Sequence, residues 1–152
     1  MALSIRLATA NDCLDVLRWR NDPLTRAMSR NSSPLDEISH CRWFDRALAD
    51  TARLLLIGED GATPFAMARF DIVAPAEWEI SIVLSPESRG EGRGRTFLKM
   101  ALSYFYSVNP DHSVLAEIKS DNAISQRLFL AQGFIQIGSS LGMLTYLLKP
   151  SS

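Results

Sequence analysis

A glycine-rich stretch with three arginines is the part of this sequence whose residue types are best suited to bind a phosphorylated ligand. It reads Ser85-Pro-Glu-Ser-Arg-Gly-Glu-Gly-Arg-Gly-Arg95 and joins a predicted strand to a predicted helix. Glycine lets a ligand approach the backbone without a Cβ in the way, and unpaired N–H groups at a helix N-terminus point at bound phosphate. Arg89, Arg93 and Arg95 add positive charge at the same rim. We therefore predict a pyrophosphate site here.

Two other phosphate-binding motifs do not fit this stretch. A Walker loop ends in Gly-Lys-Ser/Thr, whereas this stretch ends in Gly94-Arg95-Thr96 with a different glycine spacing. In the dinucleotide motif Gly-x-Gly-x-x-Gly the third glycine would come one residue later, near the start of a βαβ unit. A glycine turn with solvated arginines remains an alternative for this stretch taken alone.

A second group of residues follows about thirty positions later, on the next predicted helix. Asn122, Ser125 and Phe129 are three and four residues apart and so share one helix face. The pattern Arg89-x-x-Gly92-x-Gly94 followed by Asn122-x-x-Ser125-x-x-x-Phe129-x-x-x-Gly133-Phe134 resembles the two coenzyme A motifs of the Gcn5-related N-acetyltransferase (GNAT) family. The resemblance covers residues 77–137 strongly, and the order of strands and helices extends it over the whole chain.

The elements that must position these residues follow from hydrophobic periodicity. It predicts strands at 4–8, 53–58, 65–73, 77–84, 114–118, 134–137 and 143–148, and helices from Asn11 or Asp12 to Asn21, at about 35–48, from the glycine-rich stretch to 108, and from Ser120 or Asp121 to Gln132. Pro23 is expected to interrupt the first helix, and Ser33 to cap the second, whose predicted inner face is Leu35, Ile38, Cys41, Phe44 and Leu48. This order predicts one α/β (α+β) domain over residues 1–152, with a mixed sheet covered by helices.

The resemblance implies a fold and a cofactor. The sheet would be mostly antiparallel with six to seven strands, flanked by about four helices, with a splayed cleft between the fourth and fifth strands. The cofactor would be acetyl-coenzyme A, without a metal. Its pantetheine arm would pair with the backbone of Ile82, Val83 and Leu84. The other implied cofactor-binding residues are Arg89, Gly90, Glu91, Gly92, Arg93, Gly94, Arg95, Asn122, Ser125 and Phe129.

Acetyl transfer to an amine requires a base and an acid. Because only a neutral amine attacks a thioester, a base must remove its proton. Glu79 is our candidate, on the same strand face as Ser81; the alternative is a solvated or ion-paired glutamate, and Glu77 is the reserve. Phe129 occupies the position where many family members have the tyrosine that is assigned to protonate the leaving thiolate. Ser125, a water molecule or another tyrosine would have to supply that proton.

The end of the first predicted helix carries residues suited to bind an acceptor. The predicted acceptor wall consists of Arg18, Trp19, Arg20, Asn21, Met28, His40 and Trp43. Arginine can pair with a diphosphate and tryptophan can stack on a ring; the alternative is a helix end with a buried tryptophan and solvated arginines. The pattern looks most like acetyltransferases of UDP-linked 4-amino sugars in the pseudaminic acid pathway. A protein N-terminal amine acetyltransferase and a non-catalytic acyl-CoA sensor are the alternatives.

Composition excludes several other classes of protein. The chain of 152 residues has 16 basic and 17 acidic residues, a formal net charge of -1, so the basic surface of a nucleic-acid-binding protein is absent. No apolar run approaches the roughly 18 residues of a membrane span, and no secretory signal is visible. Cys13 and Cys41 lie in predicted helices, and such sparse cysteine is typical of a reduced protein. We therefore expect a cytoplasmic monomer or homodimer that binds a small-molecule amine.

Overall fold

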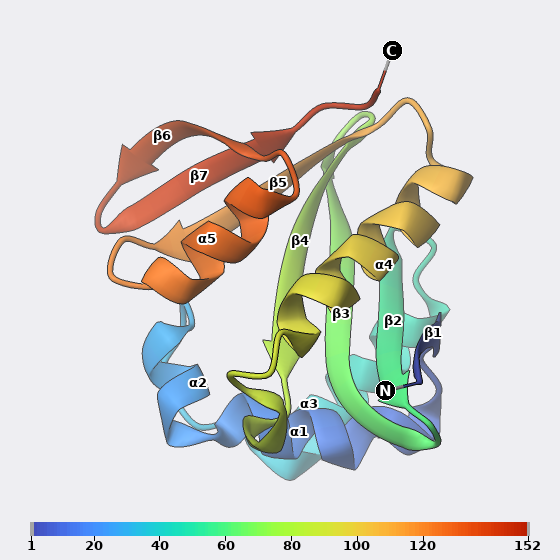
Figure 1. The fold of residues 1–152 in the computed structure, drawn as a ribbon. Helices are drawn as coiled ribbons and strands as arrows, with labels where there is room; N and C mark the ends of the chain where they lie inside the picture. Colours follow the sequence, from blue (N-terminus) through green and yellow to red (C-terminus); the bar gives the residue numbers. More distant parts are fainter. Residues whose placement is uncertain (1, 152) are drawn as a thin grey trace.

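Seven strands pair into one sheet in the computed structural model, which describes residues 2–151 (Figure 1). They are β1 (Leu3–Leu7), β2 (Arg53–Asp60), β3 (Thr63–Ala74), β4 (Glu77–Leu84), β5 (Ser113–Lys119), β6 (Ile135–Ser140) and β7 (Met143–Leu148). Across the sheet the order is β1-β2-β3-β4-β5-β7-β6. Every pair is antiparallel except β4 with β5. The predicted mixed, mostly antiparallel sheet is confirmed.

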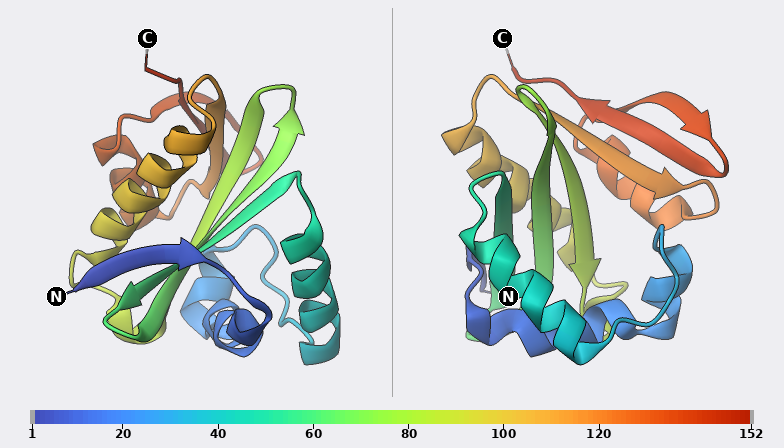
Figure 2. Two further views of the ribbon diagram at one scale, coloured as in Figure 1. Left: turned by 90° about the vertical axis from the view of Figure 1, so that its right-hand side faces the viewer. Right: turned by 180° about the vertical axis from the view of Figure 1, so that it is seen from behind.

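Helices cover both faces of this sheet. Within residues 2–151 the α-helices are α1 (Cys13–Asn21), α2 (Pro23–Met28), α3 (Glu37–Ala49), α4 (Arg93–Val108) and α5 (Ala123–Ala131). Figure 2 shows α4 on one side of the central strands and α3 on the other. No helix in this described part of the chain has the length and apolar character that crossing a membrane requires.

The core consists of two clusters because successive side chains of a strand point to opposite faces. Beneath α4, Phe70 of β3 stacks on Phe105 with the ring centroids 4.6 Å apart. Beneath α1 and α3, Trp19 and Phe44 are fully buried against Ile57 of β2. Each face of the sheet is therefore fixed by large aromatic side chains from the helices that cover it.

The parallel strands β4 and β5 separate along most of their length. Their pairing is confined to Glu77–Glu79 on β4 and Ser113–Leu115 on β5. Beyond this point β4 continues to Leu84 and β5 to Lys119 without pairing to each other, and Figure 1 shows the strands diverging. The splayed cleft between the fourth and fifth strands is confirmed. From Ser81 to Leu84, the edge of β4 that faces away from β3 has no strand partner.

Four α-helices were predicted, and α2 is the additional one in the structure. Pro23 interrupts the first helix as predicted, since α1 ends at Asn21, but it also begins α2, where its missing N–H has no cost. The side chain of Asp22 caps this helix by accepting the N–H of Thr25 at 3.1 Å. Asp-Pro therefore separates two successive helices instead of marking a break.

The start and inner face of α3 also differ from the prediction. Asp36, and not Ser33, is the N-cap, since its carboxylate accepts the N–H of Ser39 at 2.9 Å. The buried residues of α3 are His40, Phe44 and Ala47. Ile38, predicted on the inner face, is 61% exposed. Phe44, Cys41 and Leu48 of the predicted inner face do pack in the core beneath α3, so the prediction fails only near the start of the helix.

Cys13 and Cys41 are joined by a disulfide bond, so the prediction of two free thiols is wrong. Their Cα atoms are 5.9 Å apart, within the range that a disulfide spans. The packing of α1 against α3 brings the two residues together. Because 28 positions separate them in sequence, their spacing gives no indication of this contact.

Candidate active site

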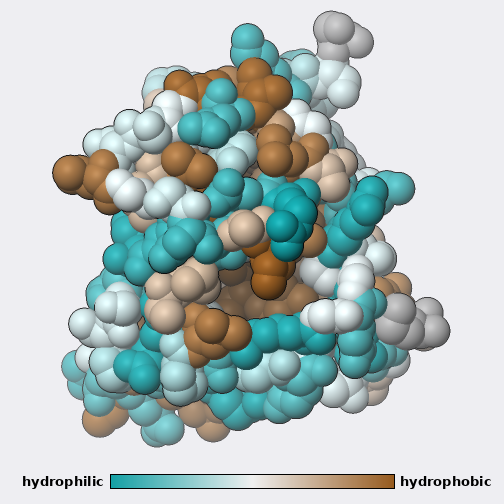
Figure 3. All heavy atoms as spheres, turned by 60° about the vertical axis from the view of Figure 1, so that its left-hand side comes forward, coloured by the Kyte–Doolittle hydropathy of each residue, from teal (hydrophilic) through white to brown (hydrophobic). Residues whose placement is uncertain are grey.

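A cavity of about 340 Å³ opens where β4 and β5 separate. It is lined by Arg20, Thr25, Met28, Ser29, Arg30, Asn31, Met67, Arg69, Glu79, Ile80, Ser81, Ile82, Val83, Ala116, Glu117, Ile118, Asn122, Ser125 and Phe129. Figure 3 shows a face of the molecule hollowed at its centre, with hydrophobic atoms at the floor and hydrophilic residues around the rim. The lining residues come from α1, α2, the segment after α2, β3, β4, β5 and α5.

The glycine-rich stretch adopts a backbone conformation that explains two of its glycines. Gly90 and Gly92 have φ angles of +78° and +74°, a region in which side chains are strained. A Cβ on either would meet nothing within 4 Å, so the requirement is conformational and not steric. Gly92 is the N-cap of α4, and the first N–H groups of that helix have no carbonyl partner within it. The predicted strand, glycine turn and helix start are present.

Two of the three arginines of this stretch fasten it to neighbouring elements. Arg89 pairs with Asp22 and donates to the Thr25 hydroxyl at 2.7 Å, which links the turn to α2. Arg93 pairs with Asp60 at 2.9 Å, at the end of β2. The exposed Arg95 lies on the first turn of α4. The turn is therefore tied to α2 through Arg89 and to the end of β2 through Arg93.

The residues predicted on one face of α5 meet at the cavity. Asn122, Ser125 and Phe129 all line it. Asn122 is the N-cap of α5, because its side-chain oxygen Oδ1 accepts the N–H of Ser125 at 3.2 Å. The helix therefore begins at Ala123, slightly later than the predicted start at Ser120 or Asp121. Phe129 is buried against Phe134, with the ring centroids 5.0 Å apart.

Strand β4 places its predicted residues on opposite sides of the sheet. Glu79, Ser81 and Val83 point to the face covered by α1 and α3, and all three line the cavity, as does Ile82. Leu84 does not line it but packs near Gly94, where an added Cβ would lie 3.4 Å from its Cδ2 atom.

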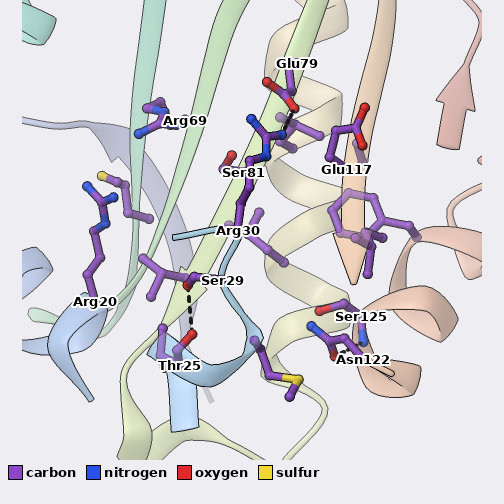
Figure 4. Close-up of a pocket in the computed structure, with 18 of the residues that line it drawn as sticks. Arg20, Thr25, Ser29, Arg30, Arg69, Glu79, Ser81, Glu117, Asn122 and Ser125 are labelled. Atoms are coloured by element: carbon purple, nitrogen blue, oxygen red, sulfur yellow. Dashed lines mark hydrogen bonds and ion pairs between the residues drawn. The ribbon is translucent and has the colours of Figure 1, made fainter. Parts of the chain in front are cut away.

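Glu79 forms an ion pair inside the cavity. Its Oε2 atom lies 2.6 Å from Nη2 of Arg30, which reaches in from the segment after α2 (Figure 4). The side chain of Glu79 is 19% exposed and that of Arg30 is 62% exposed. The ion-pair alternative considered for Glu79 is therefore present in this structure, in a pair that is open to solvent on the arginine side.

Three charged residues of the cavity were missed by sequence reasoning. Arg30 lies in a polar segment without periodicity, and Glu117 lies in a strand that was read as short and apolar. Arg69 lies on β3 directly opposite Ser81 of β4. The sequence does contain one signal for Arg69, because it stands alone between Ala68 and Phe70 in an apolar strand. A charged residue at such a position indicates that this face of the strand borders a polar surface.

Part of the predicted acceptor wall faces open space. Arg20 and Met28 line the main cavity. His40 and Trp43 line a second cavity of about 230 Å³, together with Arg20 and Arg69. The two cavities thus share Arg20 and Arg69, which lie at their junction.

The remaining residues of the predicted wall have other partners. Trp19 of α1 is fully buried in the core and lines neither cavity. Arg18 pairs with Glu87 at 2.8 Å on the surface. The side chain of Asn21 donates to the carbonyl of Leu35 at 2.9 Å and accepts its N–H at 2.7 Å. Asn21 thereby fixes the approach of the chain to α3.

Positive charge and burial coincide at the junction of the cavities. The ring centroid of Trp43 lies 5.5 Å from the guanidinium carbon of Arg20 and 5.2 Å from that of Arg69. Burial, and then the charge of Arg69, lowers the pKa of Arg20 to about 10, so Arg20 is still charged at neutral pH. Burial, and then Arg20, also lowers the pKa of His40. Its Nε2–H donates to the carbonyl of Cys13 at 3.2 Å, so Nδ1 is a buried acceptor without a partner among the described residues.

The fold and the cavity define an acyltransferase of the kind that the two sequence motifs indicated. The model of the family "Acetyltransferase (GNAT) domain" matches residues 2–135. The chain therefore belongs to the GNAT acetyltransferase family, which assigns it to the N-acetyltransferases. A comparison with curated protein sequences gives no significant match.

Solved structures share this fold over almost the whole chain. The protein yncA from Salmonella typhimurium, solved with its cofactor acetyl-CoA, is 23% identical, with a TM-score of 0.81 and coverage of 100% of this chain and 96% of that chain. A ribosomal-protein-alanine N-acetyltransferase from Brucella melitensis is 23% identical, with a TM-score of 0.81 and coverage of 96% and 99%. Spermidine N-acetyltransferase from Vibrio cholerae, in complex with CoA and spermine, is 16% identical, with a TM-score of 0.85 and coverage of 97% and 95%. The TM-scores show a shared fold, and at these identities the likeness concerns the fold alone.

Proposed function

We propose that this protein transfers the acetyl group of acetyl-coenzyme A directly to the primary amine of a small molecule bound in the cavity between β4 and β5. One observation supports this most strongly: a single cavity joins the unpaired edge of β4, the start of α5 and the carboxylate of Glu79. Acetyl-coenzyme A is the acyl donor, and a thioester lying along β4 would place its acetyl group near Glu79.

The donor would be held by backbone groups and by α5. The segment Ile82, Val83 and Leu84 pairs with β3 on one side, and its other edge has no strand partner and would hydrogen-bond the amides of the pantetheine arm, as an added strand would. The N–H groups from Gly90 to Arg95 would bind the pyrophosphate at the head of α4. Asn122 uses its carbonyl oxygen as a helix cap, which leaves its amide N–H₂ group to donate to the pantetheine.

The proposed chemistry requires three proton transfers, two from the nitrogen and one to the sulfur. Glu79, directly or through a water molecule, takes one proton from the ammonium group, and the neutral nitrogen then attacks the thioester carbonyl carbon. The nitrogen loses a second proton, to Glu79 through solvent, as the amide forms. The carbon–sulfur bond breaks, and the sulfur leaves as a thiolate that takes up one proton. Because Phe129 has no hydroxyl and no tyrosine lines the cavity, we assign this proton to Ser125. A thiol with a pKa of about 8.5 is a good leaving group, so modest assistance is sufficient. The absence of a hydroxyl at Phe129 is therefore compatible with catalysis and does not by itself favour a non-catalytic acyl-CoA sensor.

A small amine fits the cavity better than the sugar nucleotide considered from the sequence. Two contacts suggested for a UDP-linked 4-amino sugar are no longer supported, since Trp19 is buried in the core and Arg18 pairs with Glu87 outside the cavity. The N-terminus of a protein substrate would enter the same cavity only as an extended, unfolded chain end. Both remain acceptors to be tested beside small amines.

The experiment is an assay of thiol release from acetyl-CoA with a panel of amines. The panel contains amino acids, polyamines, a UDP-linked 4-amino sugar and short peptides, with mass spectrometry of the product. We expect acetylation of a small amine at its nitrogen. Release of thiol without an acetylated amine, or no release with any member, would overturn the proposal.

A further inference from the structure

The acceptor cavity is electrically asymmetric. Arg20 and Arg69 lie on one side of it, and Glu79 and Glu117 lie on the other (Figure 4). Arg20 comes from α1, Arg69 from β3, and the two carboxylates come from the two strands that diverge. Arg30 pairs with Glu79 at 2.6 Å, so a ligand that fills this cavity and replaces Arg30 at Glu79 must match cations at one end and carboxylates at the other.

The cations have hydrogen-bonding capacity that the protein does not use. Within residues 2–151, Arg20 has no ion pair or side-chain hydrogen bond, and its contact is with the face of Trp43 at 5.5 Å. Arg69 uses only Nε, which donates to Asp71 at 2.9 Å, and the other oxygen of Asp71 accepts from Arg53 at 3.1 Å. One carboxylate thus serves two arginines, and the terminal nitrogens of Arg69 stay available.

Two half-buried guanidinium groups beside each other repel, and Asp71 pairs with Arg69 but not with Arg20. The pKa of Arg20 is lowered because burial, and then the neighbouring charge of Arg69, disfavours its charged form. Guanidinium groups bind carboxylates and phosphates through paired N–H donors. A ligand anion at this point would pair with Arg20 and with the terminal nitrogens of Arg69, and would lie where the two cavities meet.

The sheet limits the distance between the anion and the amine. Arg69 lies opposite Ser81 in the register of β3 and β4, so Glu79 is its diagonal neighbour on the same face. Diagonal neighbours lie roughly 7–8 Å apart, and their Cβ atoms are somewhat closer. A molecule whose amine faces Glu79 while its anion contacts Arg69 has these two groups separated by only a few bonds.

We infer that the acceptor is a small amine that carries an anionic group, and that Arg20 and Arg69 bind this group while the amine faces Glu79. The inference rests on the proposed function of the same cavity. The short separation favours an amino carboxylate, such as an amino acid. A diphosphate would offer the same chemistry, and the experiment distinguishes these two sources.

The test compares each anionic amine with a neutral analogue. Amino acids are paired with their carboxamides, and a UDP-linked 4-amino sugar with the free amino sugar. We expect kcat/KM for an amino acid to exceed that of its amide by about tenfold or more, because the amide cannot form the charged contact. A preference for the UDP-linked sugar alone would support the inference with a diphosphate as the anion.

Variants connect the preference to the two arginines. Arg20→Gln and Arg69→Gln are expected to raise the KM for the anionic amine by about tenfold, to leave the KM for acetyl-CoA unchanged, and to reduce the preference for acid over amide. Arg20→Lys should restore part of it. Arg46→Gln is the matched control, since Arg46 is exposed on α3 and lines neither cavity.

The outcomes separate the two hypotheses. Equal rates for acids and amides, or a preference for polyamines, would overturn the inference and leave the acetyltransferase function intact. An acid preference that survives both glutamine substitutions would overturn the assignment to Arg20 and Arg69. Absence of thiol release with every amine would overturn the proposed function, and the inference with it.

Discussion

Glu79 and Arg30 are the two residues whose contact must change when an amine binds. Their ion pair is short, at 2.6 Å, but the arginine is 62% exposed and anchored only in the segment between α2 and α3. Solvent-exposed ion pairs of this kind contribute about 0.2–1 kcal/mol. An incoming ammonium group can therefore replace Arg30 at little cost, and Glu79 would then contact the proton that it has to remove.

We expect Glu79→Gln to lower kcat by about 10²-fold or more at pH 7, because glutamine cannot accept the proton of the amine. The deficit should shrink as the pH approaches about 10, where a primary amine is increasingly neutral without a base. The measurement is a pH profile of kcat. Glu77→Gln is the matched control, on the same strand face but outside the cavity. An equal loss at all pH values would contradict the role of Glu79 as a base.

Ser125→Ala tests the source of the proton for the thiolate. Its backbone N–H, and not its hydroxyl, binds the capping oxygen of Asn122, so the helix start should be preserved. We expect kcat to fall by about tenfold, less than a full general-acid contribution because a thiolate leaves readily. The affinity for coenzyme A, measured by calorimetry, should change little. An unchanged kcat would assign the proton to water.

The turn between β4 and α4 shows how one element depends on a backbone conformation. Gly92 has a φ of +74° and open space where a Cβ would be. We expect Gly92→Ala to lower the free energy of unfolding by about 1–2 kcal/mol through strain, and to weaken acetyl-CoA binding by tenfold or more because a methyl group obstructs the helix amides.

Gly142→Ala provides the matched control for this prediction. Gly142 has a φ of +79°, equally open surroundings and a position in the turn between β6 and β7. The strain should therefore be similar, while acetyl-CoA binding measured by calorimetry should be unaffected. Equal losses of affinity in both variants would contradict the proposed pyrophosphate site.

The junction between β1 and α1 depends on one buried carboxylate. Asp12 binds both terminal nitrogens of Arg6 at 2.8 Å and accepts the N–H of Thr9 at 2.8 Å. Burial by itself would raise the pKa of Asp12, but the hydrogen bonds from Arg6 and Thr9 and the charge of Arg6 outweigh it and lower the pKa. A carboxylate with a lowered pKa stabilises the fold above the unfolded-state pKa and loses this contribution as the pH falls.

We therefore expect Asp12→Asn to lower the free energy of unfolding by about 1.5–3 kcal/mol at pH 7. The difference from the unmodified protein should decrease below about pH 3.9, where the carboxylate begins to take up a proton in the unfolded chain. Urea unfolding at a series of pH values measures this. Asp45→Asn, on the exposed face of α3, should change stability by less than about 0.5 kcal/mol. A difference that does not vary with pH would contradict the explanation.

At the scale of the whole molecule, the cleft is held open by contacts on both sides. Lys119 of β5 donates to the carbonyl of Ala27 in α2 at 2.9 Å, across the separation of the strands. Arg89 ties α2 to the glycine-rich turn through Thr25. The two halves of the sheet are thus connected through α2, so the cavity is formed before a ligand enters.

Binding of acetyl-CoA to this cavity should stabilise the entire fold. At a ligand concentration of about 100 Kd the expected stabilisation is about 2.7 kcal/mol. For a domain of this size that corresponds to an increase in Tm of about 5–10 °C. Thermal unfolding with and without acetyl-CoA measures the shift, and Gly92→Ala should reduce it. No shift at millimolar acetyl-CoA would contradict the cofactor assignment.

The sequence by itself determined the elements and the half of the site that is local in the chain. The glycine turn, the head of α4 and the residues Asn122, Ser125 and Phe129 are each defined by short spacings, and these depend only on turn and helix geometry. The alternation in β4 placed Glu79 correctly on the face with Ser81. The GNAT family and the splayed sheet followed from these motifs.

Only the tertiary structure decided which distant residues share the cavity. Arg69 and Glu117 became neighbours of Glu79 through strand register, and Arg30 through a segment without regular structure. The position of α3 depended on its cap, one residue before its start, and the disulfide depended on how α1 packs against α3. Such contacts arise from burial summed over the whole core, and no local spacing in the sequence encodes them.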